Sequence, residues 1–265
     1  MIDQHTHTIF SPDASKASTF ENYLDVLHQK QVKSITFTDH CDFDCPTPLF
    51  HQIPDFYSFK RLLLKAQEKT STELQMGIEL GYQPHILPAM KRIVKEHEFD
   101  TVLLSLHYID GLDPYHGDFF QGRPLTESYQ RYFEVILEAI QAFDEFHILA
   151  HLDYIFRYSL EATDGIDITP YLPVLDAIFE HLIKHQKGLE LNTSPYRKDY
   201  QNKTPNLDII RRYYEKGGRL ISLGSDAHHP DDVGADFDQA SHFLKTVGFK
   251  ELTWVRKQNL TFVPL

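Results

Sequence analysis

Histidine and carboxylate side chains recur at the ends of short apolar segments throughout this chain of 265 residues. Each segment has the length and composition of a buried β-strand. Imidazole and carboxylate groups are common protein ligands of zinc, manganese and iron. The residues in question are His5, His7, His40, Glu79, His107, His151, Asp226 and His228. Their types predict a hydrolytic site that contains several metal ions.

The first two histidines form a pair that one strand would present on one face. In His5-Thr6-His7 the imidazoles are two residues apart, and residues at that spacing point to the same side of a strand. The pair therefore predicts two ligands of one ion, although considered alone it is also typical of a surface pair. Asp13 follows in the same stretch and can return a carboxylate to the same site.

Two carboxylates add to this prediction. Glu79 ends an apolar segment, where an unpaired buried carboxylate is costly, so it is expected to bridge two ions unless it lies at the surface. The segment 224–228, Gly-Ser-Asp-Ala-His, is the most specific local motif. Its Asp226 can bind a metal and hold the proton of a bound water, and Asp226, His228 or a water is expected to relay a proton.

The elements that carry these residues alternate between apolar and amphipathic stretches. After the segment that ends at His7, apolar segments occupy 34–38, 74–80, 101–106, 147–150, 188–191 and 220–224. Periodicity predicts helices over 20–30, 55–70 and 126–143, one that starts at 167–170 and one that opens at Thr204-Pro205. Strands that alternate with helices indicate a parallel barrel, whose strand ends gather at one mouth. We therefore predict a single α/β domain over residues 1–265.

Composition restricts the partners. The formal charge of −12 argues against sequence-independent binding of nucleic acid, whose phosphates are also negative. A small phosphorylated substrate is still compatible with this charge, because bound metals supply local positive charge. The cysteines, Cys41 and Cys45, are interpreted as reduced thiols, with metal ligation as the alternative. No signal peptide and no apolar run of bilayer-spanning length is present, so we expect a cytoplasmic protein that is not bound to a membrane. The sequence makes no prediction of oligomeric state.

In their order along the chain, these motifs resemble the PHP (polymerase and histidinol phosphatase) superfamily over residues 2–229. The resemblance implies a distorted (β/α)7 TIM-like barrel with three divalent metal ions, zinc, manganese or iron. The motifs on which the resemblance rests are His5-x-His7 with Ser11 and Asp13, Thr38-Asp39-His40, Gly77-x-Glu79, Ser105-x-His107, His151 and the 224–228 motif. The implied ligands are His5, His7, Glu79 and Asp226 for one ion, Glu79, His107 and His151 for the second, and Asp13, His40 and His228 for the third. Some relatives have His in place of Asp13, which implies a different metal preference at the third position.

Within the superfamily the chain resembles the histidinol-phosphate phosphatases. This resemblance is carried by Asn192-Thr193-Ser194 followed by Arg197-Lys198, and by His151-Leu152-Asp153 followed by Arg157-Tyr158. It implies that Asn192, Arg157, Arg197 and Lys198 bind phosphate, since a guanidinium group matches phosphate oxygens. The alternative is that the cations are solvated loop residues. Pro195-Tyr196 stands where relatives often have Gly-Leu.

The implied reaction is hydrolysis of L-histidinol phosphate to L-histidinol and phosphate, a step of histidine biosynthesis, by attack of a metal-bridging hydroxide. This substrate carries an amine and an imidazole, so an acidic and aromatic mouth is expected. Candidates on the two long loops at the mouth, 41–54 and 108–124, are Asp42, Phe43, Tyr115 and Asp118; His116 and His229 also lie near it.

Three alternatives remain. A phosphoesterase of the same superfamily could act on phosphotyrosine, nucleotides or oligonucleotides, and the charge of −12 disfavours the nucleic-acid substrates. An amidohydrolase would cleave C–N bonds, but those barrels commonly bridge their metals with a carbamylated lysine, and Glu79 stands in that place. A non-catalytic barrel would usually have lost ligands, whereas this chain retains a full set of nine, namely His5, His7, Asp13, His40, Glu79, His107, His151, Asp226 and His228.

Overall fold

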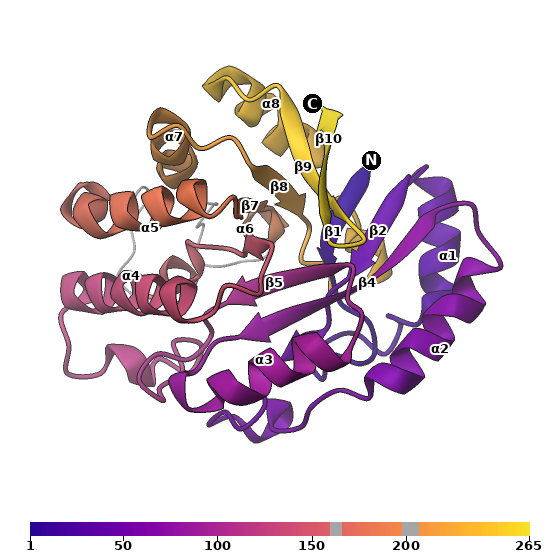
Figure 1. The fold of residues 1–265 in the computed structure, drawn as a ribbon, viewed down its shortest axis with the longest axis horizontal. Coiled ribbons are helices and arrows are strands. Elements are labelled where there is room, and N and C mark those ends of the chain that lie inside the picture. The colour runs from indigo at the N-terminus through magenta and orange to yellow at the C-terminus, as the bar shows by residue number, and fades with distance from the viewer. Residues whose placement is uncertain (160–165, 198–206) are drawn as a thin grey trace.

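A ring of parallel strands forms the centre of the molecule. The computed structural model describes residues 1–159, 166–197 and 207–265. Strand order in the sheet is β1-β2-β4-β5-β6-β7-β8, and β3 pairs with β4 beyond the end of β2. The strands are β1 (Ile2–Thr6), β2 (Ser34–Phe37), β3 (His40–Cys41), β4 (Glu73–Gly81), β5 (Thr101–Ser105), β6 (Ile148–Leu149), β7 (Gly188–Asn192) and β8 (Ile221–Gly224). The predicted α/β barrel is confirmed (Figure 1).

The ring closes where the chain after β1 meets the chain after β8. Thr6 and Ala227 form a parallel bridge, and the amides of His7 and Asp226 donate to the carbonyls of Ala227 and His5, both at 2.8 Å. The buried Tyr23 supports this seam, because its hydroxyl donates to the His7 carbonyl at 2.6 Å. Residues from both ends of the chain are thereby held side by side.

Helices surround the ring (Figure 1). They are α1 (Phe20–Gln29), α2 (Phe56–Gln67), α3 (Leu87–Glu96), α4 (Leu125–Ala142), α5 (Leu172–Lys184), α6 (Ser194–Arg197), α7 (Leu207–Glu215) and α8 (Phe237–Val247). Short 3-10 turns occupy Pro48–Phe50, Pro84–Ile86, Asp118–Phe120, Tyr154–Arg157, Thr169–Tyr171 and Pro230–Asp232. Buried aromatic and aliphatic side chains of α1, α2, α4 and α5 pack against the strands in one continuous core.

The predicted helices are confirmed with small shifts of their ends. Thr19 caps α1 by accepting from the Asn22 amide, and Asp55 caps α2 by accepting from the Ser58 amide. The helix predicted to start at 167–170 begins only at Leu172, because the prolines at 170 and 173 lack the amide protons that a longer helix would need. The predicted helix start at Thr204-Pro205 lies outside the described residues.

An antiparallel hairpin at the end of the chain was not predicted. It consists of β9 (Glu251–Arg256) and β10 (Asn259–Pro264), and β9 packs against β8 and β1. Trp254 donates from Nε1 to Gln75 at 3.0 Å, and Gln4 bonds to Thr253 and Val255. Val255 also packs on residues of β5 and β6. The hairpin therefore fills the end of the ring opposite the strand-end histidines.

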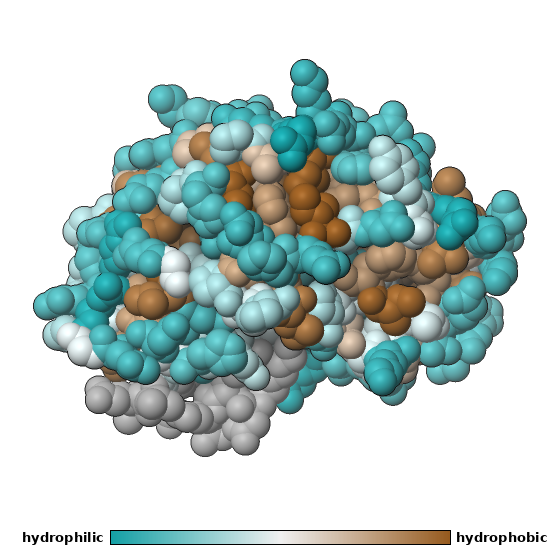
Figure 2. Space-filling view, turned by 90° about the horizontal axis from the view of Figure 1, so that it is seen from below, coloured by the Kyte–Doolittle hydropathy of each residue, from teal (hydrophilic) through white to brown (hydrophobic). Residues whose placement is uncertain are grey.

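The face of the molecule drawn in Figure 2 is mostly polar. Hydrophilic residues cover most of the face in Figure 2, and apolar residues show there in separate patches. Within the part of the chain that the structure describes, no helix has both the length and the apolar character of a bilayer span.

We expect Tyr23→Phe to lower the free energy of unfolding by about 1–3 kcal/mol, because the buried His7 carbonyl would lose its side-chain donor. Thermal or denaturant unfolding of the variant would measure the loss. Tyr57→Phe is the matched control, since Tyr57 is 78% exposed and should be neutral. Equal stability of the two variants would show that the hydroxyl does not support the closure of the barrel.

Candidate metal centre

The side chain of Glu79, at the end of β4, lies at the middle of the predicted ligands. It is fully buried, and five imidazoles surround its two oxygens. Oε2 lies 3.2 Å from His5 Nε2, 3.5 Å from His7 Nε2 and 3.0 Å from His40 Nδ1. Oε1 lies 2.7 Å from His151 Nε2 and 3.2 Å from His107 Nε2. Residues that are far apart in the sequence therefore meet around one carboxylate, as the strand-end pattern predicts.

Asp226 joins the histidines of β1 to those that follow β8. Its Oδ1 lies 3.3 Å from His7 Nε2, 3.4 Å from His228 Nδ1 and 3.9 Å from His5 Nε2. Ser194, Asn192 and Arg157 approach Oδ2 from the other side, at 3.2, 3.4 and 3.5 Å. The carboxylate is thereby held with Oδ1 toward the histidines.

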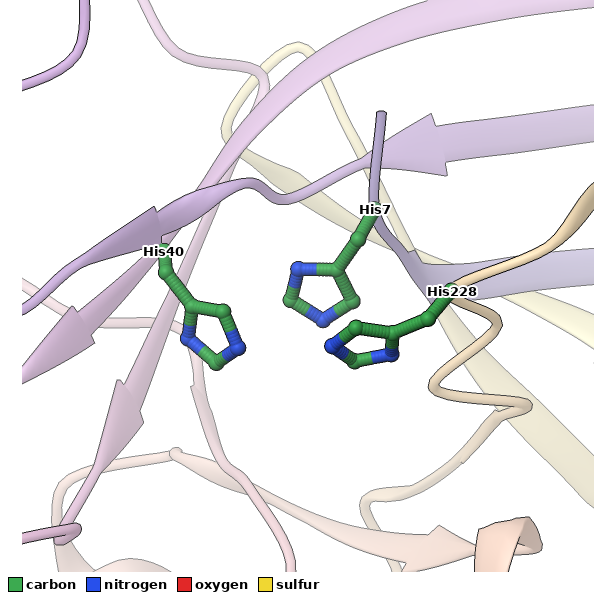
Figure 3. Close-up of side chains that lie close together, drawn as sticks. All are labelled: His7, His40 and His228. Carbon is green, nitrogen blue, oxygen red and sulfur yellow. The ribbon is translucent and has the colours of Figure 1, made fainter. Parts of the chain in front are cut away.

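The third predicted group is more exposed than the other two. Asp13 Oδ2 lies 3.1 Å from His228 Nε2 and 3.7 Å from His40 Nε2. The ring of His7 stacks between these two imidazoles, with centroid distances of 4.1 Å to His228 and 4.3 Å to His40. Figure 3 shows the three rings converging from three separate segments of the chain. We call the nine predicted ligands the Glu79 cluster.

Backbone pairing and local strain position these groups. The strand β3 pairs His40 directly with Glu79 of β4, which sets the two side chains next to each other. His151 and Asp226 adopt positive φ angles of 21° and 53°, which non-glycine residues rarely do. Such strained conformations concentrate at functional sites, so both outliers support a functional role of the cluster.

Several buried atoms of the cluster have no hydrogen-bond partner. They are His5 Nε2, His7 Nε2, His40 Nδ1, Glu79 Oε2 and His151 Nδ1. Leaving a buried polar atom unpaired is costly, and bound cations would satisfy the lone pairs that meet here. Groups with ligand atoms within 4.8 Å of one another, among the described residues, are His7-His40-His228, His5-His151-Asp226, His5-His7-Glu79, His40-Asp42-His107 and Glu79-His107-His151. The residues present thus fit a site for several metal ions.

The Nδ1 atom is occupied in three of these imidazoles. His5 Nδ1 lies 2.8 Å from Glu190 Oε1, His107 Nδ1 lies 2.7 Å from Asp42 Oδ1, and His7 Nδ1 lies 2.9 Å from Ser11 Oγ. Acceptors of this kind orient metal-binding histidines and keep Nε2 available for the ion. Sequence reasoning missed Glu190, although a carboxylate inside the apolar segment 188–191 was a usable signal.

Burial and the neighbouring carboxylates act in opposite directions on the pKa of His5 and of His107. Burial disfavours the cation of His107, but the carboxylates of Asp42 and Glu79 outweigh burial and raise its pKa to about 9. Burial is likewise outweighed at His5, where Glu190 and Glu79 raise the pKa well above its usual value. The same attraction, mainly from His40 and His5, overcomes burial at Glu79 and lowers its pKa. Without metal, the cluster therefore holds protons that balance its buried carboxylates.

A pocket of about 420 Å³ opens above the cluster. Its wall includes Arg157, which is 5% exposed, together with Asp42 and Tyr115 of the two long loops. Phe43, Asp118 and His229 do not line it, whereas His116 does. The remaining lining residues are Asp13, His40, Thr47, Leu49, Phe50, His107, Tyr108, Asp113, His151, Tyr154, Tyr158, Asp226 and His228.

Arg197, which was predicted to bind phosphate, does not line the pocket. Arg197 donates from Nη2 to the Ser225 carbonyl, lies 3.5 Å from Asp232, and is not part of the pocket wall. Of the two arginines that were predicted to bind phosphate, only Arg157 therefore lies in the pocket wall. The role of Arg197 stays a prediction. Lys198 lies outside the described residues. Cys41 and Cys45 are buried, and neither enters a candidate metal group among the described residues.

Comparison with known proteins identifies the family. A family model described as PHP domain matches residues 3–194. A probable histidinol-phosphatase of Clostridium acetobutylicum is 28% identical over 97% of this chain and 98% of its own length, and a histidinol-phosphatase of Lactococcus lactis is 27% identical over 95% and 93%. The fold matches that of the Lactococcus lactis histidinol phosphate phosphatase solved with zinc, L-histidinol and phosphate, with a TM-score of 0.87, 24% identity and 98% coverage of both chains. This chain belongs to the PHP domain family.

Proposed function

We propose that this protein is a metal-dependent phosphatase that hydrolyses L-histidinol phosphate to L-histidinol and phosphate. The observation that carries the proposal is the Glu79 cluster with Arg157 in the wall of the same pocket. The full-length similarity to histidinol-phosphatases supports this substrate. The β8 strand, Asp226 and His228 follow the matched residues 3–194 and belong to the same barrel, which supports a domain that extends over residues 1–265.

The proposed ligands of the ions are those implied by the sequence. His5, His7, Glu79 and Asp226 would hold the first, Glu79, His107 and His151 the second, and Asp13, His40 and His228 the third. The five unpaired buried atoms of the cluster support this assignment. Divalent ions bound there would lower the pKa of water and neutralise charge on the phosphoryl group. Imidazole and carboxylate donors suit zinc, manganese and iron alike.

Residues of the chain would bind the phosphoryl group and move the protons. Arg157 presents a planar guanidinium group to the pocket, which suits two oxygens of one phosphate. Asn192 and Ser194 hold Oδ2 of Asp226, so that its Oδ1 can accept a proton from the attacking water. His228 lines the pocket beside Asp13, and we propose that it relays a proton to the leaving alcohol.

The aromatic lining of the pocket suits the organic part of this substrate. It is formed by Phe50, Tyr108, Tyr115, Tyr154 and Tyr158, with the carboxylate of Asp113 among them. Aromatic faces stack on an imidazole ring and attract cations, and a carboxylate can pair with the ammonium group. An aromatic wall would also admit the phenyl ring of phosphotyrosine, so both substrates belong in the test.

A substrate screen tests the proposal directly. We expect metal-loaded protein to release phosphate from L-histidinol phosphate, and a chelator to abolish the release, which a colorimetric phosphate assay would measure. Phosphotyrosine and a nucleoside monophosphate are the comparison substrates, and both should be hydrolysed at least tenfold less efficiently. Hydrolysis of phosphotyrosine with inert histidinol phosphate would overturn the substrate but keep the class of enzyme.

Arg157→Ala should lower kcat/KM for histidinol phosphate by about 100- to 1000-fold, the range seen when one donor to a developing negative charge is removed. Arg157→Lys should recover only part of this loss, because an ammonium group cannot bind two oxygens in one plane. Steady-state kinetics would measure both, with Arg92→Ala as the control, since Arg92 lies on α3 and its side chain is 61% exposed. A loss below threefold in Arg157→Ala would remove Arg157 from the proposed site.

Metal uptake should depend on pH. The pKa of His107 in the metal-free protein is raised to about 9, so at lower pH an ion must displace its proton. Apparent zinc affinity should therefore rise by about tenfold per pH unit for each displaced proton and level off near pH 9. Chelator competition between pH 6.5 and 8.5, with proton release measured in weak buffer, would test this. Affinity that is independent of pH would contradict a protonated cluster.

A further inference from the structure

Two buried carboxylates contact histidines of the Glu79 cluster without being among its nine predicted ligands. Glu190, on β7, is 3% exposed and accepts hydrogen bonds from three donors. These donors are His5 Nδ1 at 2.8 Å, the His151 amide at 2.9 Å and Asn192 Nδ2 at 3.1 Å. One carboxylate thus connects β1, the segment that follows β6, and the end of β7. Its position fixes the orientation of the His5 ring.

Asp42 has the same relation to the other side of the cluster. It follows β3, is also 3% exposed, and was expected only to contact substrate. Its Oδ1 lies 2.7 Å from His107 Nδ1, and its Oδ2 lies 3.3 Å from His40 Nδ1. Because Asp42 and Glu190 occupy the Nδ1 atoms, His107 Nε2 faces Glu79 Oε1 and His5 Nε2 faces Glu79 Oε2, both at 3.2 Å. The two carboxylate–imidazole pairs therefore flank Glu79.

A glycine on a strand makes room for each carboxylate. A Cβ atom at Gly224, the end of β8, would overlap Glu190 Oε1 and lie 2.5 Å from His5 Cβ. A Cβ atom at Gly81, the end of β4, would overlap Asp42 Oδ1 and lie 2.6 Å from its Cγ. Neither glycine has a positive φ angle, so the backbone would accept alanine at both positions. At Gly81 the requirement for glycine is one of space beside the carboxylate, and at Gly224 it is one of space beside both Glu190 and His5.

We propose that Glu190 and Asp42, seated against Gly224 and Gly81, are positioning residues that set which nitrogen of His5 and of His107 faces the metal ions. The proposal rests on the metal site of the proposed function. An imidazole that donates from Nδ1 to a carboxylate must carry its lone pair on Nε2, which is the form that binds a metal. Glu190 orients the His5 ring toward the ion that His5 would bind, and Asp42 orients the His107 ring toward the ion that His107 would bind. Gly81 acts only through Asp42, whereas Gly224 leaves space for Glu190 and for the Cβ of His5.

The isosteric variants Glu190→Gln and Asp42→Asn test the carboxylates. In Glu190→Gln an NH2 group, which cannot accept a hydrogen bond, replaces one of the two carboxylate oxygens. The amide can therefore not accept from His5, His151 and Asn192 as the carboxylate does, and the hydrogen bond that orients the His5 ring is disrupted. Each variant should lower the affinity for zinc at one position by about 10- to 100-fold, the usual effect of removing such a partner. Elemental analysis and chelator competition would measure affinity and the number of ions per chain. Affinity within threefold of the parent in both variants would overturn the proposal.

A spectroscopic measurement separates positioning from a general loss of structure. In zinc-loaded protein labelled with ¹⁵N-histidine, NMR should report two imidazoles with protonated Nδ1 that respond to different variants. Glu190→Gln should shift the signals of His5 and leave those of His107 unchanged, and Asp42→Asn should do the reverse. Equal changes of both rings in both variants would mean a structural role only, and would contradict the proposal.

Gly81 is tested by combining substitutions. Gly81→Ala should lower zinc affinity by about 10- to 100-fold, as Asp42→Asn does, because the added methyl group displaces the carboxylate. In an Asp42→Ala background the same change should cost less than threefold, since no carboxylate remains to be displaced. Gly224 does not allow this cycle, because an added Cβ there would also lie 2.5 Å from the Cβ of His5. Additive losses in the Gly81 cycle would show that this glycine acts independently of Asp42.

Gly188→Ala is the control, because Gly188 lies at the start of β7 and an added Cβ would come no closer than 3.2 Å to a neighbouring atom. It should leave zinc affinity within threefold of the parent. Circular dichroism and thermal unfolding would establish that each variant folds, and the isosteric variants decide the proposal if an alanine variant does not. All of these readings are made without substrate. If the protein did not hydrolyse histidinol phosphate, this inference would therefore still stand. If the positioning tests failed, the proposed hydrolysis would likewise be unaffected.

Discussion

The buried carboxylate of Glu79 is the group on which the rest of the site depends. A fully buried anion is stable only beside positive charge, and five imidazoles surround its two oxygens. In the metal-free protein that charge comes from histidines such as His5 and His107, whose pKa values are raised against the effect of burial. Bound cations would supply it in their place. Metal ions and protons thus compete for one set of nitrogens, and the fold has to hold this set together in either state.

The barrel holds the cluster together by closing a ring. Hydrogen bonds between the chain after β1 and the chain after β8 bring His5 and His7 next to Asp226, and Tyr23 supports that seam. At the opposite end of the ring, the β9–β10 hairpin covers the interior with Trp254 and Val255. One end of the barrel is therefore packed and the other is polar. This division lets buried carboxylates and imidazoles accumulate at the mouth without opening the core to water.

The predictions from the sequence agree best with the structure where a local sequence pattern determines the position of a residue. His40 and Glu79 follow apolar segments, and their strands pair in register, so their meeting could be foreseen. The C-terminal hairpin was missed, because its β9 strand is buried by contacts with Gln4 and Gln75 rather than by an alternating pattern of its own. The position of the Arg197 side chain also depends on contacts that the local sequence pattern does not show. Its position after a strand end suggested a place in the pocket, but a backbone carbonyl and Asp232 hold its guanidinium elsewhere.

By itself, the sequence determined the types of the metal-binding side chains, their order and their placement at strand ends, because strand periodicity and residue chemistry are local properties. Only the tertiary structure decided which nitrogen of each histidine faces the cluster, which carboxylates orient the rings and which arginine enters the pocket. These outcomes depend on contacts between distant residues: His5 bonds to Glu190, 185 positions away, in a space that exists because residue 224 has no side chain. Only the folded chain brings such partners together, and no local pattern encodes the space between them.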